Sequence, residues 1–371
     1  MGVIVEEVAS RRDMRQFIGF PLSLYADDPC FVPHLLAERK RFFSAKNPLF
    51  EFTDVDYLLA RDEEGRAVGR ITAHVNHRHN EFWDESTGFF GFFESVNELD
   101  VARALLEAAE DRLRQRGMAL IRGPLNFSTN HECGFLADGF DRLPAIMMPY
   151  TKRYYLDFMG QLGYVKARDL LAYHYTCKDE TPQYLVRFAN KVERRAGVTI
   201  RTLDMRDFRE DIKRAFSVYN RAWAQNWGFV PMTEAQFAYL AQELKDVVEP
   251  SLALFAEIEG RPVGFSLALP DYNPLLKKVK GRVLPFGFLV LLAGRRRIDA
   301  VRVLTMGVVR EHRKRGIDVL LIYHTFVNGL KRGYYRGEFS WILEENVLLR
   351  RAMDRMGAAR SKTYRIFERE L

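Results

Sequence analysis

The apolar residues of this chain recur with two periods, one typical of helices and the other of strands. Between Glu98 and Arg116 they return every three or four positions, and Gly117 then ends the pattern as a helix-terminating residue. The same spacing predicts a second long helix from Ile317 to Lys331. Shorter apolar runs, bounded by glycine and polar residues, predict strands between the helices. The chain is therefore predicted to be α/β, with mixed sheets.

The order of these elements occurs twice. Each half reads as strand, helix, helix, hairpin, strand, long helix, strand, helix and strand. The hairpin over residues 56–73 reappears over residues 252–268, with Arg66 and Arg261 in corresponding positions 195 residues apart. We therefore predict two tandem domains of one fold. They cover residues 1–178 and 179–371, and the second contains an insertion at 273–300.

The composition fits a folded intracellular protein better than a disordered or secreted one. Of the 371 residues, 47% are hydrophobic, which is enough for two buried cores. The three cysteines, Cys30, Cys133 and Cys177, are too few and too widely spaced for a disulfide framework. The N-terminus shows no charged and then apolar leader, and no apolar run is long enough to cross a bilayer. We expect a cytoplasmic protein.

The charge of the chain limits the classes of partner that it is expected to bind. The net charge is +7 and the isoelectric point is near 9.2, which favours anionic partners. Nucleic acid, anionic lipid and a phosphorylated cofactor all fit this charge. Nucleic acid is the weakest of the three, because no helix-turn-helix, zinc-finger or RNA-binding aromatic pattern accompanies the basic residues.

Residues 301–318 carry the clearest chemistry. An apolar strand, residues 301–309, leads into a basic turn with Arg313, Arg315 and Gly316, and an apolar helix follows. A helix that begins at such a turn presents unpaired backbone N–H groups and the positive end of its dipole to an anion. Glycine lets the backbone approach closely, and the arginines add charge. We expect a pyrophosphate group to bind here.

The pattern Arg313-x-x-Gly316-x-Asp318 resembles the cofactor loop of the GNAT (Gcn5-related N-acetyltransferase) superfamily. The resemblance covers the order of elements in both halves and continues through Asn346 to Gly357, similar to a family segment that begins with Asn and ends with a helix-terminal Gly. It implies two tandem GNAT-like domains, of which the second binds acetyl-CoA or a longer acyl-CoA and transfers the acyl group to a primary amine. The cofactor-binding residues that it implies are Val308, Val309, Arg313, Lys314, Arg315, Gly316, Ile317 and Asn346.

Two residues depart from the family pattern. Asp318 stands where the family has a small residue, and it brings negative charge toward the pyrophosphate, although Asp is also favoured in the first turn of a helix. Met353 stands where many relatives carry an aromatic general acid, and a thioether cannot donate a proton. Another acid or a solvent proton must then protonate the leaving thiolate.

The resemblance further implies a general base that deprotonates the amine. Glu344 and Glu345 end the strand that follows the cofactor helix, and Glu344 is the preferred base. The alternative is a solvated carboxylate in front of a helix. Asn346 is either a helix cap or a cofactor contact, and Tyr364 is either the general acid or a structural tyrosine.

The first half lacks a basic turn after its equivalent strand, residues 88–94, and is interpreted as a degenerate GNAT-like domain. Its residues 123–134 are instead dense in hydrogen-bonding groups. They form either a loop capped by its own Asn and Ser side chains or an acceptor pocket with His131 or Glu132 as the base. A nucleophilic Cys133 is disfavoured, because a thioester donor needs no covalent relay.

A histidine cluster near the first hairpin invites a metal interpretation. His74, His77 and His79 form a His-x-x-His-x-His pattern, but Asn76 and Asn80 among them indicate a polar loop and no second cluster is evident. We predict no metal site.

The insertion combines an apolar stretch, residues 283–293, with basic residues on both sides. It is a buried or domain-interface helix, a peripheral membrane contact, or the wall of a tunnel for a long acyl chain. The last two hypotheses imply lipidic chemistry, and the chain is in this respect similar to GNAT-like bacterial ceramide synthases, although no single residue carries that resemblance. The basic residues are Lys277, Lys278, Lys280, Arg282 and Arg295 to Arg297.

Two rival functions stay open at this point. One is a non-catalytic acyl-CoA-binding or lipid-binding protein, in which Asp318 and Met353 mark lost chemistry. The other is a tandem-GNAT aminoacyl transferase that uses tRNA, which would need a basic groove.

Overall fold

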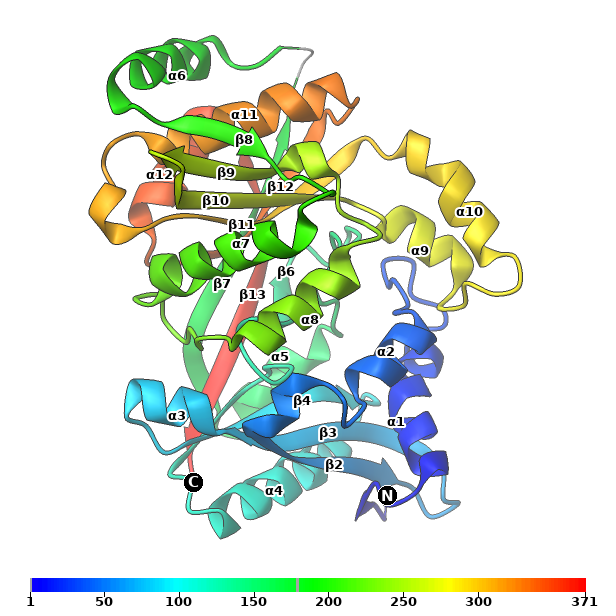
Figure 1. Ribbon diagram of the computed structural model, residues 1–371. Coiled ribbons are helices and arrows are strands. Elements are labelled where there is room, and N and C mark those ends of the chain that lie inside the picture. Colours follow the sequence, from blue (N-terminus) through cyan, green and yellow to red (C-terminus); the bar gives the residue numbers. More distant parts are fainter. Residues whose placement is uncertain (1, 178–179) are drawn as a thin grey trace. The chain divides into compact units, whose positions relative to one another are not determined.

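The computed structural model describes residues 2–177 and 180–371 (Figure 1). Their contacts form two compact units. Unit 1 comprises residues 2–170, Asn273–Ala293 and Lys362–Leu371, and unit 2 comprises residues 171–177, 180–272 and Gly294–Ser361. Most of the insertion expected in the second domain, residues 273–293, thus packs within unit 1, and its residues 294–300 belong to unit 2. The expected boundary at residue 178 falls outside the described residues and stays a prediction.

The strands of unit 1 follow the order β1-β2-β3-β4-β5-β13, and β6 also pairs with β13. Pairing is antiparallel from β1 to β4, parallel between β4 and β5, and antiparallel between β5 and β13. The strands are β1 (Ile4–Glu7), β2 (Thr53–Arg61), β3 (Ala67–Asn76), β4 (Thr87–Ser95), β5 (Leu120–Gly123), β6 (Phe135–Asp138) and β13 (Ala359–Glu370). The helices are α1 (Arg11–Leu24), α2 (Leu36–Phe42), η1 (Pro48–Glu51), α3 (His77–Trp83), α4 (Leu99–Gln115), α5 (Tyr154–Gln161), α9 (Asn273–Val279) and α10 (Gly287–Gly294).

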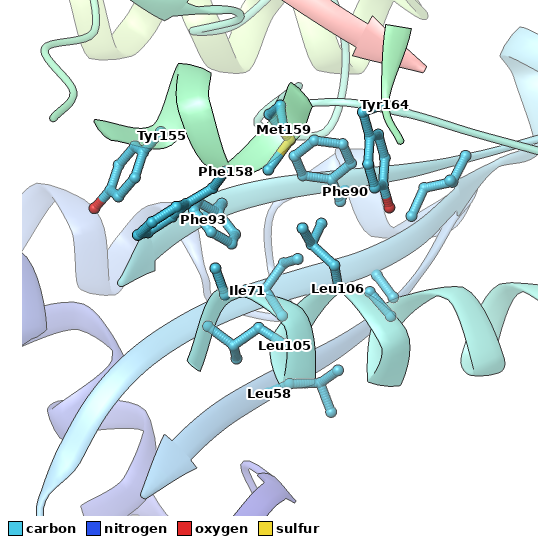
Figure 2. Close-up of a cluster of buried hydrophobic side chains, with 14 of the residues drawn as sticks. Leu58, Ile71, Phe90, Phe93, Leu105, Leu106, Tyr155, Phe158, Met159 and Tyr164 are labelled. Carbon is cyan, nitrogen blue, oxygen red and sulfur yellow. The ribbon is translucent and has the colours of Figure 1, made fainter. Parts of the chain in front are cut away.

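The main core of unit 1 forms where α4 packs on β3 (Figure 2). Leu105 and Leu106 of α4 lie on the face of the helix that the apolar period predicted. They share one buried cluster with Ile71 of β3, Phe90 of β4 and Tyr155 of α5. Burying one such leucine contributes about 2 kcal/mol, so this contact fixes the helix on the sheet.

The histidine segment is a helix, and the expected polar loop is wrong. The side-chain oxygen of Asn76 accepts a hydrogen bond from the His79 N–H at 3.0 Å and caps α3. His74 lies within β3 and is buried, whereas His77 and His79 contact Asp54 and Glu85 respectively. Among the described residues, no group of three or more His, Cys, Asp or Glu side chains is arranged to hold a metal ion.

Unit 1 buries one carboxyl group in a network of hydroxyl groups. Glu94 of β4 accepts hydrogen bonds from Tyr25 at 2.7 Å and Tyr155 at 2.8 Å, and Arg70 lies 4.0 Å away. Burial raises the pKa of Glu94 to about 7, although Arg70 and the two hydroxyl groups oppose the shift. The carboxyl group therefore titrates near neutral pH while it is folded.

The free energy of unfolding should consequently fall as the pH rises from about 4.5 to about 7. The folded-state pKa of Glu94 lies above the unfolded value, so folding favours its protonated form, and that advantage is lost as the pH rises through this window. The loss is on the order of 3 kcal/mol. Glu94→Gln should remove it, as measured by urea unfolding at pH 5 and pH 8. Glu81→Gln, at an exposed position of α3, is the control, and an unchanged pH dependence in Glu94→Gln would refute the assignment.

The strands of unit 2 follow the order β7-β12-β11-β10-β9-β8, and residues 165–170 at the start of β7 belong to unit 1. Pairing is parallel between β11 and β12 and antiparallel from β11 to β8. The strands are β7 (Val165–Thr176), β8 (Thr199–Thr202), β9 (Ala253–Ile258), β10 (Arg261–Pro270), β11 (Ala300–Val308) and β12 (Arg336–Leu343). The helices are α6 (Gln183–Ala196), α7 (Phe208–Trp223), α8 (Glu234–Leu244), η2 (Pro250–Leu252), η3 (Arg295–Arg297), η4 (Arg310–His312), α11 (Ile317–Lys331) and α12 (Val347–Met356).

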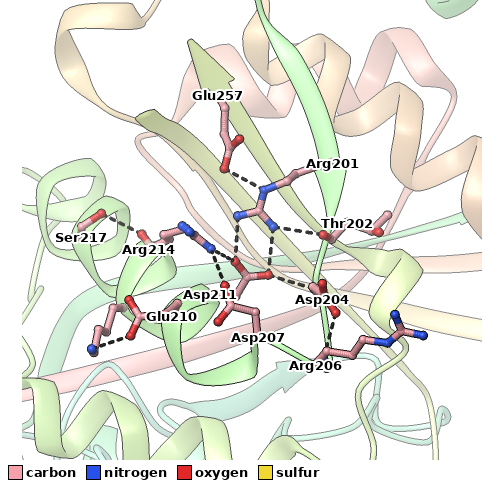
Figure 3. A network of polar contacts seen from close by, with 11 residues as sticks. Arg201, Thr202, Asp204, Arg206, Asp207, Glu210, Asp211, Arg214, Ser217 and Glu257 are labelled. Atoms are coloured by element: carbon pink, nitrogen blue, oxygen red, sulfur yellow. Dashed lines mark hydrogen bonds and ion pairs between the residues drawn. The ribbon is translucent and has the colours of Figure 1, made fainter. Parts of the chain in front are cut away.

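The edge strand β8 is tied to α7 by a network around Asp211 (Figure 3). The buried carboxylate of Asp211 accepts two hydrogen bonds from Arg201, at 2.9 and 2.8 Å, and one from Arg214 at 2.7 Å. Arg201 also donates to Glu257 at 2.8 Å. These ion-paired side chains line a charged hollow of about 490 Å³. Their role is to stabilise the edge of the sheet, and we do not assign a reacting group to this place.

The strong periodic patterns predicted the elements closely. The helix expected from Glu98 to Arg116 is α4, and the one expected from Ile317 to Lys331 has those same bounds in α11. The two hairpins are β2–β3 and β9–β10. In the described part of the chain, no helix combines the length and the apolar character that a membrane span requires.

Candidate functional site

The strand-to-helix turn of unit 2 has the geometry of an anion site. Gly316 is the N-cap of α11 with φ +80°, and no side chain in the described residues caps this end. The first intrahelical bond joins the Leu320 N–H to the Gly316 carbonyl at 3.2 Å. The amides of residues 317–319 therefore precede the helical ladder and are available to an anion at the positive end of α11.

Arg313 holds this turn in place through two backbone carbonyls, and its expected contact with the cofactor stays a prediction. Its Nε donates to the Val308 carbonyl at 3.1 Å and its Nη2 to the Ala222 carbonyl at 2.6 Å. These bonds tie the turn to the end of β11 and to the end of α7. Lys314 and Arg315 are exposed, and they are the cations that can meet a phosphate.

The two valines before the turn are buried, and their backbone groups have partners within unit 2. The Val309 N–H donates to the Val263 carbonyl at 2.9 Å, and the Val308 carbonyl accepts from Arg313. Their expected contact with the cofactor stays a prediction. Ile317 is buried at the start of α11, so only its backbone amide can serve an anion.

Strands β11 and β12 part beside this turn. Their parallel pairing runs from Ala300 with Arg336 to Val303 with Phe339, and both strands continue beyond it. The last residues of the two strands therefore lie outside this parallel ladder.

A buried polar group at this fork was not found from the sequence. Arg302 of β11 donates to the Ser340 hydroxyl at 2.9 Å and to the Ser340 carbonyl at 3.2 Å, and that hydroxyl donates to Glu338 at 2.7 Å. All three side chains are buried. The signal was an arginine in one apolar strand beside a glutamate in the next, because Arg302 and Glu338 are register partners. The group fixes the point at which the strands separate.

The candidate base residues follow the end of β12. Glu344 is half-buried and Glu345 is exposed, and the Glu344 carbonyl accepts a hydrogen bond from Arg350 at 2.7 Å. Asn346 is the N-cap of α12, where its side chain accepts from the Leu349 N–H at 3.2 Å. The capping interpretation of Asn346 is therefore observed, while its cofactor contact stays a prediction.

The two departures from the family pattern differ in environment. Asp318 is exposed in the first turn of α11, where a carboxylate stabilises the helix dipole. Met353 is fully buried in a core cluster with Leu171, Ile342 and Met356. Met353 thus fills the core of unit 2.

In unit 1, the corresponding fork is filled by the chain itself. Parallel pairing of β4 with β5 ends at Phe89 with Arg122, and the segment after β5 then enters the fork. The Phe92 N–H donates to the Asn126 side chain at 2.8 Å, and a Cβ on Gly91 would lie 2.1 Å from the Leu125 carbonyl oxygen. The segment after β5 therefore packs closely against β4 at this fork, and the expected loss of the cofactor site in this half stays a prediction.

The polar segment of unit 1 is stabilised by an ion pair. Arg39 of α2 donates to Glu132 at 2.7 Å, and Asn126 donates to the other carboxylate oxygen at 3.0 Å. Burial acts to raise the pKa of Glu132, but the neighbouring Arg39 and His34 outweigh this effect and lower the pKa to about 2. A carboxylate this acidic is a weak proton acceptor at neutral pH.

His131 and Tyr364 are also held within unit 1. Burial lowers the pKa of His131 to about 4, and its Nδ1 lies 3.1 Å from the Ser128 hydroxyl. The imidazole is therefore neutral at pH 7. Tyr364 is fully buried and pairs with Leu136 in the β6–β13 ladder. Their catalytic roles stay predictions, and the contacts of this segment favour the capped-loop interpretation.

Comparisons with known proteins agree with this geometry. No family model matches the chain. It is 35% identical to protein YghO of Escherichia coli (strain K12), covering 99% of this chain and 95% of that protein. It is 33% identical to the bacterial ceramide synthase of Caulobacter vibrioides, covering 98% and 96%.

Solved structures show the fold. A tandem GNAT protein from the clavulanic acid biosynthesis pathway matches with a TM-score of 0.60 at 13% identity, over 100% of this chain and 98% of that one. A GCN5-related N-acetyltransferase from Sphaerobacter thermophilus matches with a TM-score of 0.54 at 16% identity, over 99% and 95%. The chain therefore has the tandem GNAT fold and belongs to the family of protein YghO and the bacterial ceramide synthase.

Proposed function

We propose that this protein is an acyl-CoA-dependent N-acyltransferase that moves an acyl group from coenzyme A to a primary amine. The observation that carries the proposal is the anion site at α11, where a glycine N-cap, uncapped amides and two exposed cations lie at the end of β11. Coenzyme A is an anionic substrate with a pyrophosphate group, which suits a helix N-terminus. The GNAT fold and the ceramide synthase relative both support acyl transfer.

In the proposed reaction, Glu344 takes a proton from the ammonium group of the acceptor. The neutral amine attacks the thioester carbonyl, so that a C–N bond forms, the C–S bond breaks and the new amide nitrogen gives up its second proton to solvent. The thiolate of coenzyme A leaves and takes up a proton from solvent or another acid, since Met353 has none to give. Glu344 suits the base role because it is half-buried beyond the end of β12, whereas Glu132 is too acidic.

We further propose that the amine is lipidic. A ceramide is the amide of a long-chain amine, and the relative named for its synthesis matches nearly the whole chain. The exposed apolar stretch of the insertion supports the same class of acceptor. The length of the acyl chain is a separate question.

Glu344→Gln should lower kcat by about 100-fold and leave the affinity for acyl-CoA nearly unchanged, because it removes a proton acceptor without changing shape. The measurement is release of free coenzyme A with a long-chain amine as acceptor, together with calorimetric titration of the acyl-CoA. Glu345→Gln, at the neighbouring exposed carboxylate, is the matched control and should retain activity.

Two outcomes would contradict these assignments. If Glu345→Gln alone loses turnover, the base is the exposed neighbour. If neither variant changes kcat while His131→Ala does, the base lies in unit 1.

A further inference from the structure

Unit 1 carries an apolar segment, residues 283–293, whose residues are all exposed or half-buried. Leu284, Phe286 and Leu292 are 77%, 73% and 69% exposed. No residue of α10 is buried in the described structure, and its side chains are apolar on every face. A helix that is hydrophobic all round is ordinarily covered. The expectation of a buried helix is therefore wrong for this segment.

The base of the insertion is firmly attached to unit 1. The Asn273 side chain donates to the Pro144 carbonyl at 2.8 Å, and the Leu36 N–H donates to the Gly281 carbonyl at 3.0 Å. Lys277 bonds the Pro29 carbonyl. These contacts hold α9 and the turn after it, while no residue of α10, beyond them, is itself buried. Its exposure is thus a feature of a supported structure.

The basic residues on both sides of the segment indicate which kind of surface can bind it. Lys278, Lys280 and Arg282 precede it and are exposed. Arg295, Arg296 and Arg297 follow directly in the chain and are exposed. Residues 272–298 contain neither Asp nor Glu. An apolar body between basic residues complements a surface that is apolar inside and anionic at its boundary.

We propose that the apolar segment docks on an anionic lipid bilayer, with α10 inserted at the headgroup boundary and the basic residues at the phosphates. The helix is about 12 Å long, which suits it to lie in the interface and not to cross the membrane. Such docking would bring the protein to lipidic substrates. It rests on the insertion alone and not on the acyltransferase chemistry.

The test is co-sedimentation of the full chain with vesicles of about three parts phosphatidylcholine to one part phosphatidylglycerol, without acyl-CoA or amine. Lys278→Gln, Lys280→Gln and Arg282→Gln combined should weaken binding on the order of 100-fold, and added salt should weaken the parent similarly. Leu284→Ser, Phe286→Ser and Leu292→Ser combined should remove the binding that survives high salt. Val165→Ser, at a 61% exposed apolar position of β7, is the control and should bind normally.

Three results would overturn the proposal. In the first, the parent protein does not sediment with the vesicles. In the second, both combined variants bind the vesicles as the parent does. In the third, the vesicles bind none of the proteins, and light scattering shows a dimer of the parent that is absent only in the serine variant. The last result would assign the segment to a second copy of this chain. Because the readout is binding and not turnover, failure here leaves the proposed reaction untouched.

Discussion

Gly316→Glu is expected to weaken acyl-CoA binding by at least about 100-fold. Gly316 has φ +80° at the N-cap of α11, a backbone conformation that a side chain strains. A Cβ placed there would lie 2.6 Å from a methyl group of Val192 in α6, so the turn must also shift. The carboxylate would in addition oppose the pyrophosphate at the proposed site. Calorimetric titration with acyl-CoA measures the loss.

A matched control separates these effects from general destabilisation. Gly333, just beyond the other end of α11, has φ +83°, and a Cβ added there would meet none of its non-adjacent described neighbours within 4 Å. Gly333→Glu should therefore cost similar backbone strain, about 1 kcal/mol, and leave the affinity for acyl-CoA intact. Gly316→Ala with Val192→Ala relieves the clash without adding charge. Equal affinities of Gly316→Glu and the parent would remove the cofactor assignment.

Local patterns in the sequence were sufficient to predict the elements but not their contacts. The apolar run of α11 and the glycine-containing turn before it were sufficient to predict both of its ends, because helix formation depends on neighbouring residues. The short α3 was missed, since its seven residues carry no clear period and its cap, Asn76, also fits a loop. The assignment of the insertion to unit 1 depends on bonds such as that from Leu36 to Gly281, which join residues far apart in the chain.

The candidate site shows the same limit. The turn around Gly316 was predictable, because a strand, a basic turn and a helix follow one another in sequence. The role of Arg313 was not, since its partner Ala222 lies near the end of α7, distant in the chain. Arg302 and Glu338 were not predicted for a related reason: they are neighbours only because β11 and β12 pair in this register. Sequence periodicity identifies a strand but does not give its neighbour's register.

Glu132→Gln is expected to lower the free energy of unfolding on the order of 3 kcal/mol at pH 7. The side chains of Glu132 and Arg39 are each only 12% exposed, so the substitution leaves a nearly buried guanidinium without its closest counter-ion. The pKa of Glu132, about 2, lies below its unfolded value. The pair therefore stabilises the fold above about pH 4.5 and loses that effect as the pH falls toward 2.

Urea unfolding of Glu132→Gln at pH 7 measures this loss, and Glu38→Gln is the matched control. Glu38 also lies near Arg39, at 3.5 Å, but its side chain is 35% exposed, so its removal should cost less than about 1 kcal/mol. Adding Arg39→Gln to Glu132→Gln should recover part of the stability, because the uncompensated charge is then gone. A Glu132→Gln protein that unfolds like the parent, yet loses turnover at unchanged acyl-CoA affinity, would instead make Glu132 the catalytic base, because only a proton-transfer role would then account for the defect.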